Sequence, residues 1–129
     1  MRFAKYLLIC GALAGCAVHP YQFARAVPGK SVEATYKCAI GQANMLGYSI
    51  AQGDKDTGYF KAEKAFTPGM ASWDWNQAMK HELAVLITEQ SGGGAKISLT
   101  ASRYKNGSLE KVDKYLKTDA DAVVRACSN

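Results

Sequence analysis

The chain has 129 residues, 21% of them charged, and a formal net charge of +5, which suits one small folded domain and no more. The lysines and arginines are scattered along the sequence, so the clustered basic footprint of a nucleic-acid-binding protein is missing. The mild positive charge allows a loose attraction to anionic lipid headgroups that needs no dedicated site.

The first 16 residues have the parts of an export signal. Arg2 and Lys5 form a positive end, residues 6–13 are apolar, and Ala14 and Gly15 are small. The apolar run is about half of the roughly 20 residues that a membrane-spanning helix needs. The run Leu13-Ala14-Gly15-Cys16 resembles the lipobox of bacterial lipoproteins. The alternative is an ordinary secretory signal that is cut nearby and leaves Cys16 unmodified.

The lipoprotein resemblance implies cleavage before Cys16, thioether-linked diacylglycerol on this cysteine, and a further acyl chain such as palmitate on its amine. Two or three acyl chains make a stable membrane anchor where one is marginal. Ala17 stands where an aspartate usually favours inner-membrane retention, so the resemblance points to the outer membrane, facing the periplasm. We therefore expect residues 1–15 to be a signal peptide, 16–30 a lipidated N-terminus and tether, and 31–129 a single domain.

Cys38 and Cys127 remain after Cys10 leaves with the signal and Cys16 takes the lipid. An even pair in an exported, oxidising setting predicts a disulfide, and two buried free thiols are the alternative. No other cysteine or histidine stands at metal-ligand spacing, so we expect no metal and no cofactor.

Two helices are expected, one at each end of the domain. Pro20 and Pro28 break any helix in the preceding segment, which we expect to be an extended tether. Ser31 is a predicted N-cap and Gly47 a predicted C-terminal stop. Between them, apolar residues recur on one helix face: Val32, Tyr36, Ala39, Ala43 and Leu46. A second helix is expected to start at a capping box in residues 118–121 and to bury one face: Ala120, Val123, Val124 and Cys127.

Four strands are expected between the two helices. Residues 48–52 and 59–64 form a predicted hairpin, in whose loop Asp54 and Asp56 are solvated turn residues. Residues 80–89 and 96–104 alternate between apolar and polar side chains, with a glycine-rich turn between them. Their polar alternate positions predict a sheet with one face in water. Residues 108–117 fit either a short helix or an extended return.

The expected fold is α+β, a four-stranded antiparallel sheet with two helices packed on one face, in the order α-β-β-β-β-α, with one disulfide between the helices. The run from Ala43 to Ile50, then Asp54, Asp56 and residues 58–63, resembles the helix-grip units of BamC-type lipoproteins of the outer-membrane barrel-assembly machinery. The resemblance implies the fold but carries over no functional residue.

Large apolar side chains crowd into residues 65–77, which hold Pro68 and Gly69: Phe66, Met70, Trp73 and Trp75. They either plug the end of the core or form a contact surface for a partner. We expect a non-catalytic, membrane-anchored envelope lipoprotein that binds a protein partner.

Two other functions are open at this point. One is a binding module for a lipid or a peptidoglycan or other glycan ligand, with a pocket lined by Met45, Met70 and Trp73. The other is an enzyme, which we do not expect, because Glu82 points to the face of the strand opposite to its neighbour His81.

Overall fold

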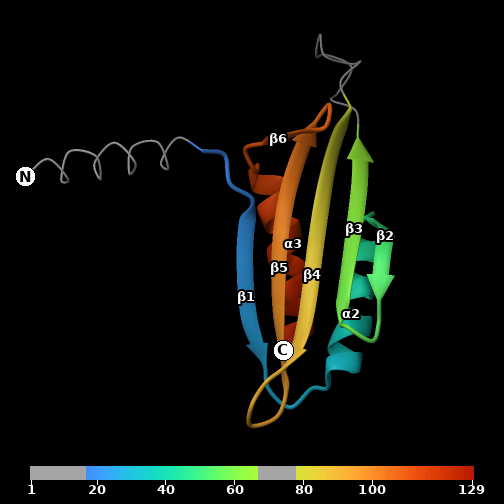
Figure 1. Cartoon of the computed structure of the whole chain (residues 1–129), viewed down its shortest axis with the longest axis vertical. Helices are drawn as coiled ribbons and strands as arrows, with labels where there is room; N and C mark the ends of the chain where they lie inside the picture. The colour runs from blue at the N-terminus through green and yellow to red at the C-terminus, as the bar shows by residue number, and fades with distance from the viewer. Residues whose placement is uncertain (1–16, 67–77) are drawn as a thin grey trace, which may run out of the picture.

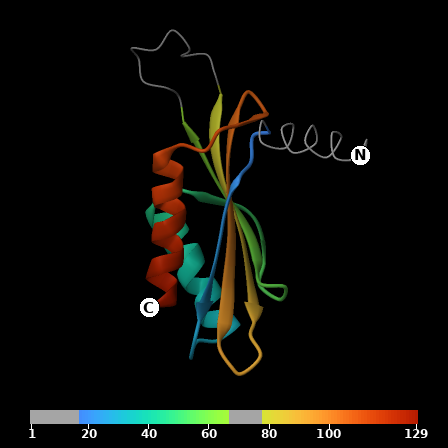
Figure 2. The same ribbon diagram turned by 90° about the vertical axis from the view of Figure 1, so that its left-hand side faces the viewer.

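The computed structural model describes residues 17–66 and 78–129, which form a sheet with two helices. Figure 1 shows the elements, and Figure 2 shows both helices on the same face of the sheet. In chain order they are β1 (Tyr21–Val27), α2 (Val32–Met45), β2 (Ser49–Asp54), β3 (Tyr59–Phe66), β4 (Met79–Glu89), β5 (Ala95–Lys105), β6 (Ser108–Glu110) and α3 (Lys114–Ser128).

The sheet is antiparallel and has six strands, not the expected four. Its order is β1-β5-β4-β3-β2, and β6 pairs with β5 beyond the end of β1. The observed order of elements is therefore β-α-β-β-β-β-β-α, which corrects the predicted order. The α+β class, the two expected hairpins and the packing of both helices on one face are confirmed.

The extra strand β1 lies in the segment that was expected to be a tether. Pro20 and Pro28 flank β1 rather than interrupt it, a place where proline costs the sheet no hydrogen bond. Every second residue of β1 faces the helices: Tyr21, Phe23, Arg25 and Val27. Because Arg25 is one of these four, the alternation of apolar and polar residues is interrupted in the sequence.

The helix α2 begins and ends where the sequence predicts. The Ser31 side chain accepts a hydrogen bond from the Ala34 backbone N–H at 3.1 Å. At the other end, Gly47 has a φ of +92°, and the backbone N–H of Tyr48 donates to the Ala43 carbonyl at 3.0 Å. This is a Schellman ending, which glycine permits because it adopts a positive φ without strain.

The helix α3 begins four residues before the predicted capping box. Asp113 is its N-cap, and the Asp113 carboxylate accepts a hydrogen bond from the Leu116 N–H at 2.8 Å. Thr118, the expected cap, lies inside the helix and donates to the Lys114 carbonyl. Leu116 is fully buried, and its burial favours a helix that starts one turn earlier. The predicted buried face of this helix is confirmed.

A disulfide joins α2 to α3, as the sequence predicts. Cys38 and Cys127 are bonded, with 5.7 Å between their Cα atoms. Cys127 is fully buried, while Cys38 is half-buried at the rim of the core. The core itself fills the space between the helices and the inner face of the sheet. Its largest fully buried side chains are Phe60, Leu83, Ile87, Ile97, Leu99 and Leu116.

Neither of the two described helices, α2 and α3, covers the outer face of the sheet (Figure 2). Polar and small side chains occupy the outward positions of β4 and β5, and the exposed Leu86 is an exception. The sheet therefore has one face in water, as the alternation predicts.

Candidate functional site

The residues predicted to carry function divide into two groups. Cys38 and Cys127 form the predicted disulfide. Cys16, Met70, Trp73 and Trp75 lie outside the described residues, and Phe66 contributes the last backbone position of β3. Lipidation of Cys16 and the aromatic contact surface therefore stay predictions.

The strand β1 is one edge of the sheet and starts five residues after Cys16. Its inner face is attached to α3. The Tyr21 hydroxyl donates a hydrogen bond to the Asp121 carboxylate at 2.9 Å, and the Lys117 ammonium lies 5.8 Å from the centre of the Tyr21 ring. The hydrogen bond to Asp121 and burial raise the pKa of the Tyr21 phenol. The edge strand is thus fixed to the domain at the point where the chain enters it.

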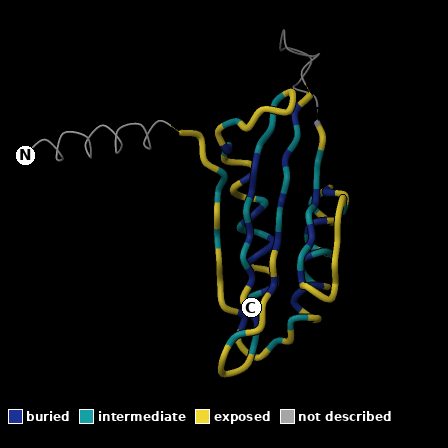
Figure 3. The backbone as a smooth tube through the Cα atoms, viewed as in Figure 1, coloured by how far each residue is buried: buried dark blue, intermediate teal, exposed yellow. Residues whose placement is uncertain are grey.

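The outer edge of β1 is open along its length. All seven residues pair in one uninterrupted register with β5, and no strand in the described parts of the chain pairs with the other side. Gln22, Ala24 and Ala26 are exposed, and Figure 3 shows most of the strand in the colour of exposed residues. Alanine side chains leave the backbone N–H and C=O groups within reach of another chain.

The opposite edge strand, β2, differs from β1. Its register shifts between Ile50 and Gln52, and the strand ends with Gly53 and Asp54. A bulge and a charged end are features that prevent an edge from pairing with another strand. Arg25 is the single charge in β1, and its register shows no bulge. Of these two edges, β1 is the more regular, since its pairing is uninterrupted over seven residues and only its flanking prolines and Arg25 oppose an added strand.

A buried polar cluster lies on the inner face, at the end of the sheet where α3 begins. His81 of β4 is 6% exposed, and its Nε2 atom lies 3.5 Å from a carboxylate oxygen of Asp113. Arg103 of β5 approaches the same oxygen at 3.7 Å. Close by, the Tyr48 hydroxyl donates to Asp119 at 2.9 Å, and burial followed by this bond raises the pKa of Tyr48. The sequence indicates this position of His81, since it has the same parity in β4 as Leu83 and Val85.

The protonation state of His81 follows from its burial. Burial lowers the pKa of His81, and this outweighs the opposing effect of the nearby Asp113 carboxylate. The two carboxylates serve the fold, because Asp113 caps α3 and Asp119 accepts from Tyr48. Glu82 lies on the other face of β4 and bonds Lys80 at 3.6 Å, so it does not orient His81.

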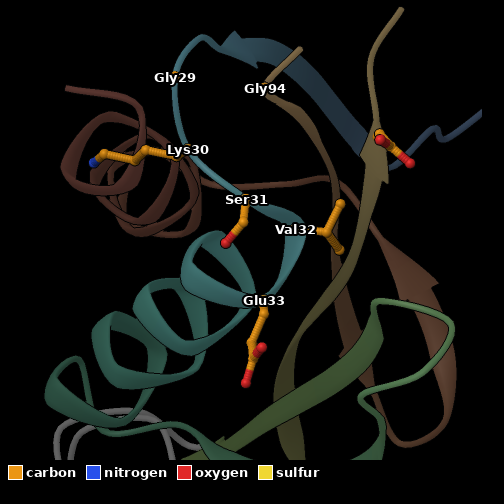
Figure 4. A pocket seen from close by; sticks show the side chains of 7 residues that line it. Gly29, Lys30, Ser31, Val32, Glu33 and Gly94 are labelled. Carbon is orange, nitrogen blue, oxygen red and sulfur yellow. The ribbon is translucent and has the colours of Figure 1, made fainter.

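A hollow of ≈ 350 Å³ lies beside this cluster, and a larger one of ≈ 500 Å³ lies at the far end of the molecule (Figure 4). The polar groups around the larger hollow are bound elsewhere. Lys30 donates to the Asn129 carbonyl at 2.7 Å, and Ser31 caps α2. Glu33 pairs with Lys55 and Lys37, whose ammonium groups lower the pKa of the Glu33 carboxyl. Figure 4 shows Lys30 and Glu33 pointing in different directions, so they do not converge on a ligand.

Within residues 17–66 and 78–129, no group of three or more histidine, cysteine, aspartate or glutamate side chains is arranged to hold a metal ion. In the same part of the chain, none of the helices is both long and apolar enough to cross a bilayer.

Comparison with known proteins gives a fold relationship. No protein-family model matches the chain, and no curated protein matches it. Among solved structures, the chain is similar to a DUF4468 family protein from Bacteroides ovatus ATCC 8483, with a TM-score of 0.50 and 12% sequence identity. The match covers 85% of this chain and 86% of that one. At this identity the likeness concerns the fold alone.

Proposed function

We propose that the protein is a non-catalytic bacterial envelope lipoprotein, anchored through lipid on Cys16 in the outer membrane facing the periplasm, whose domain binds a protein partner. The observation that supports it most is the open edge of β1, which starts five residues after the anchoring cysteine. An edge strand of this kind accepts an extended segment of another protein as an added strand. The backbone groups of β1 then supply the affinity, and its alternate side chains supply the specificity.

The outer edge of β1 suits a protein strand better than a second layer of helices. Its exposed side chains are short at Ala24 and Ala26, so an incoming backbone meets little steric resistance. Lys30 and Tyr21 hold the two ends of the strand region to α3, through the Asn129 carbonyl and Asp121. A strand that is already ordered loses little conformational entropy when a partner pairs with it.

A non-catalytic role agrees with how the polar cluster is used. Asp113 and Asp119 are engaged by the α3 cap and by Tyr48, and His81 is buried beside them. These contacts hold the cap of α3, Tyr48 and His81 together on the inner face, so they have a structural explanation that needs no reaction.

The alternative, a lipid or glycan module, receives less support from the described residues. Such a module needs a cavity in the core, and the space between sheet and helices is filled by fully buried side chains. Met45, one of the three residues expected to line a pocket, is 79% exposed on α2.

The test is photocrosslinking in the native envelope. A benzophenone amino acid replaces Ala24 on β1 in one variant and Gln52 on β2 in the matched control, both at exposed positions on edge strands. We expect irradiation to join the Ala24 variant to one envelope protein and to leave the Gln52 variant largely uncoupled, because only β1 offers an uninterrupted edge.

Two results would count against the proposal. Equal crosslinking at both positions would mean random collisions, and no adduct at Ala24 would remove β1 as the docking strand. The aromatic alternative is tested in the same cells with Trp73→Ala and Trp75→Ala. If these changes abolish the adduct while the protein stays folded, the partner also contacts residues 65–77.

A further inference from the structure

Three exposed lysines gather at the end of the molecule where the chain enters the sheet. Lys111 precedes α3, and Lys114 and Lys117 lie in its first turn, at spacings of three residues. Lys111 and Lys117 line a surface hollow together with His19, Pro20 and Tyr21, so the lysines lie directly beside the N-terminal segment. Figure 2 shows the start of β1 and the start of α3 at the same end of the sheet.

These lysines differ from Lys37, Lys55 and Lys80, which have acidic partners, and share the lack of an ion pair among the described residues with Lys61, Lys96 and Lys105. Lys37 and Lys55 both pair with Glu33, and Lys80 pairs with Glu63 and Glu82. In the described portion of the chain, Lys111, Lys114 and Lys117 form no ion pair. Asp113 lies between them in sequence, but its carboxylate faces Arg103 and His81. The three lysines are neighbours in sequence, and the fold brings Lys111 and Lys117 beside the N-terminal segment, far from them in sequence.

An exposed aromatic ring lies next to Lys114, at the rim of the hollow that also holds Lys64, Asp113 and Asp119. Tyr115 is 67% exposed, and the Lys114 ammonium lies 5.2 Å from the centre of its ring. Tyrosine with an apolar ring and a polar hydroxyl is enriched at the headgroup level of membranes. Lysine side chains near an anionic leaflet are each attracted to it within about one Debye length, roughly 8–10 Å.

The length of the N-terminal segment fixes how far this end can lie from the membrane. Tyr21 is the fifth residue after Cys16, and an extended chain spans at most about 3.5 Å per residue, or roughly 17 Å in all. Lipid on Cys16 therefore holds the Tyr21 backbone within that distance of the headgroups, and the Lys117 ammonium lies 5.8 Å from the Tyr21 ring.

We infer that Lys111, Lys114, Lys117 and Tyr115 form a membrane-docking end that binds anionic lipid headgroups and sets the orientation of the domain. This inference rests on the proposed lipid anchor and adds to it a second, electrostatic contact. A lipid anchor alone leaves the domain free to rotate, and a second contact on the same membrane restricts it. The glycine turn at residues 92–94 then points away from the membrane, since it lies at the far end of β4 and β5.

The test is lysine footprinting of the protein purified from its envelope and reconstituted into vesicles. A water-soluble acylating reagent is applied to protein in phosphatidylcholine vesicles and in vesicles that also contain phosphatidylglycerol. On anionic vesicles we expect acylation of Lys111, Lys114 and Lys117 to slow about fivefold, the factor expected from one lysine's attraction to an anionic surface, and this protection to be lost in high salt. The exposed Lys37, Lys55 and Lys96 are internal controls and should react equally on both vesicles.

A pair of matched variants separates surface binding from a change in folding. Amide hydrogen exchange of residues 111–118 should slow on anionic vesicles for the natural protein and for Lys37→Gln/Lys55→Gln/Lys96→Gln. It should not slow for Lys111→Gln/Lys114→Gln/Lys117→Gln, although that variant should keep the same exchange in its core strands.

The digest used for footprinting also reports whether Cys16 carries lipid, so the two proposals fail separately. Lipid on Cys16 with equal lysine reactivity on both vesicles would overturn the docking end and leave the anchor intact. Protein without lipid would contradict the anchor. Anionic vesicles would then be added to that protein: protection of the three lysines would support the membrane-docking end, and no protection would overturn it. Protection of all six lysines alike would also overturn it, because it would mean unspecific adsorption.

Discussion

At the scale of single residues, the fold changes the pKa of His81, the histidine of the inner face, mainly through burial. His81 is buried among groups with opposite effects on its pKa. The carboxylates of Asp113 and Asp119 raise the pKa, the cations of Arg103 and Lys64 lower it, and burial decides in favour of a lowered value. A histidine whose pKa is lower in the folded protein than in the unfolded chain favours folding fully above the unfolded pKa of about 6.5. Below that pH its contribution to stability decreases.

We therefore predict that stability falls as the pH drops through 6.5 and continues to fall until the folded protein also takes up the proton. Urea unfolding at pH 7.5 and pH 5.5 measures this, with His81→Gln as the variant that removes the titration. The variant should lose less stability over this range than the natural protein. A natural protein that becomes more stable on acidification would mean that Asp113 keeps His81 charged, contrary to this account.

Gly58 is the glycine that the fold tolerates least in exchange for another residue. It is buried with a φ of +73°, and its carbonyl accepts a hydrogen bond from the Ile87 N–H at 2.8 Å. A Cβ atom at this position would collide with the Ile87 carbonyl oxygen.

We predict that Gly58→Ala destabilises the protein by about 1–2 kcal/mol for the left-handed backbone and about 1–3 kcal/mol more for the collision. Gly92→Ala is the control, because Gly92 also has a positive φ, of +93°, but no atom lies within 4 Å of the added Cβ. Thermal or urea unfolding of both variants compares the two costs. Equal losses of stability in the two variants would mean that β4 moves away from the added Cβ at position 58 at little cost in free energy.

At the scale of the elements, the sequence predicts the helices and strands whose apolar pattern is continuous. The stripe of α2, the alternation of β4 and β5 and the closing face of α3 all come from side chains that the core buries. The strand β1 escapes prediction because an edge strand buries little: apart from Val27, its residues are exposed or half-buried, and Arg25 interrupts the pattern. The strand β6 has three residues, too few for a period, and follows a turn at Asn106 and Gly107, both with positive φ.

The start of α3 could not be decided locally, because Asp113 and Thr118 are both suitable caps. Contacts far apart in sequence settle it: Leu116 enters the core, and Asp119 and Asp121 bind Tyr48 and Tyr21 instead of completing a capping box.

The disulfide is the covalent link between the two helices, and it closes a loop with a sequence separation of 89. We predict that Cys38→Ser/Cys127→Ser lowers the free energy of unfolding by about 2–4 kcal/mol, chiefly because the unfolded chain regains freedom. Urea unfolding with and without reductant measures the loss. Reduction should destabilise the natural protein to a similar extent and leave the double variant unchanged. A double variant as stable as the oxidised protein would contradict this role.

At the scale of the whole molecule, the features that carry the proposals arise from juxtaposition. The open edge of β1 can be identified only when the order of the strands is known. The membrane-docking end can be placed beside the N-terminal segment only when the contact between α3 and Tyr21 is known. The sequence predicts the disulfide, but it places the start of the domain at residue 31, whereas the sheet begins at Tyr21. It cannot predict the contact of Lys117 with Tyr21, whose positions are 96 residues apart in sequence.

The proposed anchoring of the domain at its β1 end through Cys16 is tested most directly by peptide mass spectrometry of the protein from its native envelope without reduction. We predict a mature chain that begins at Cys16 and carries diacylglycerol on its sulfur, in the same molecules that contain the Cys38–Cys127 link. A chain cut elsewhere, with Cys16 absent or unmodified, would contradict the lipid anchor and make the protein an unanchored exported domain.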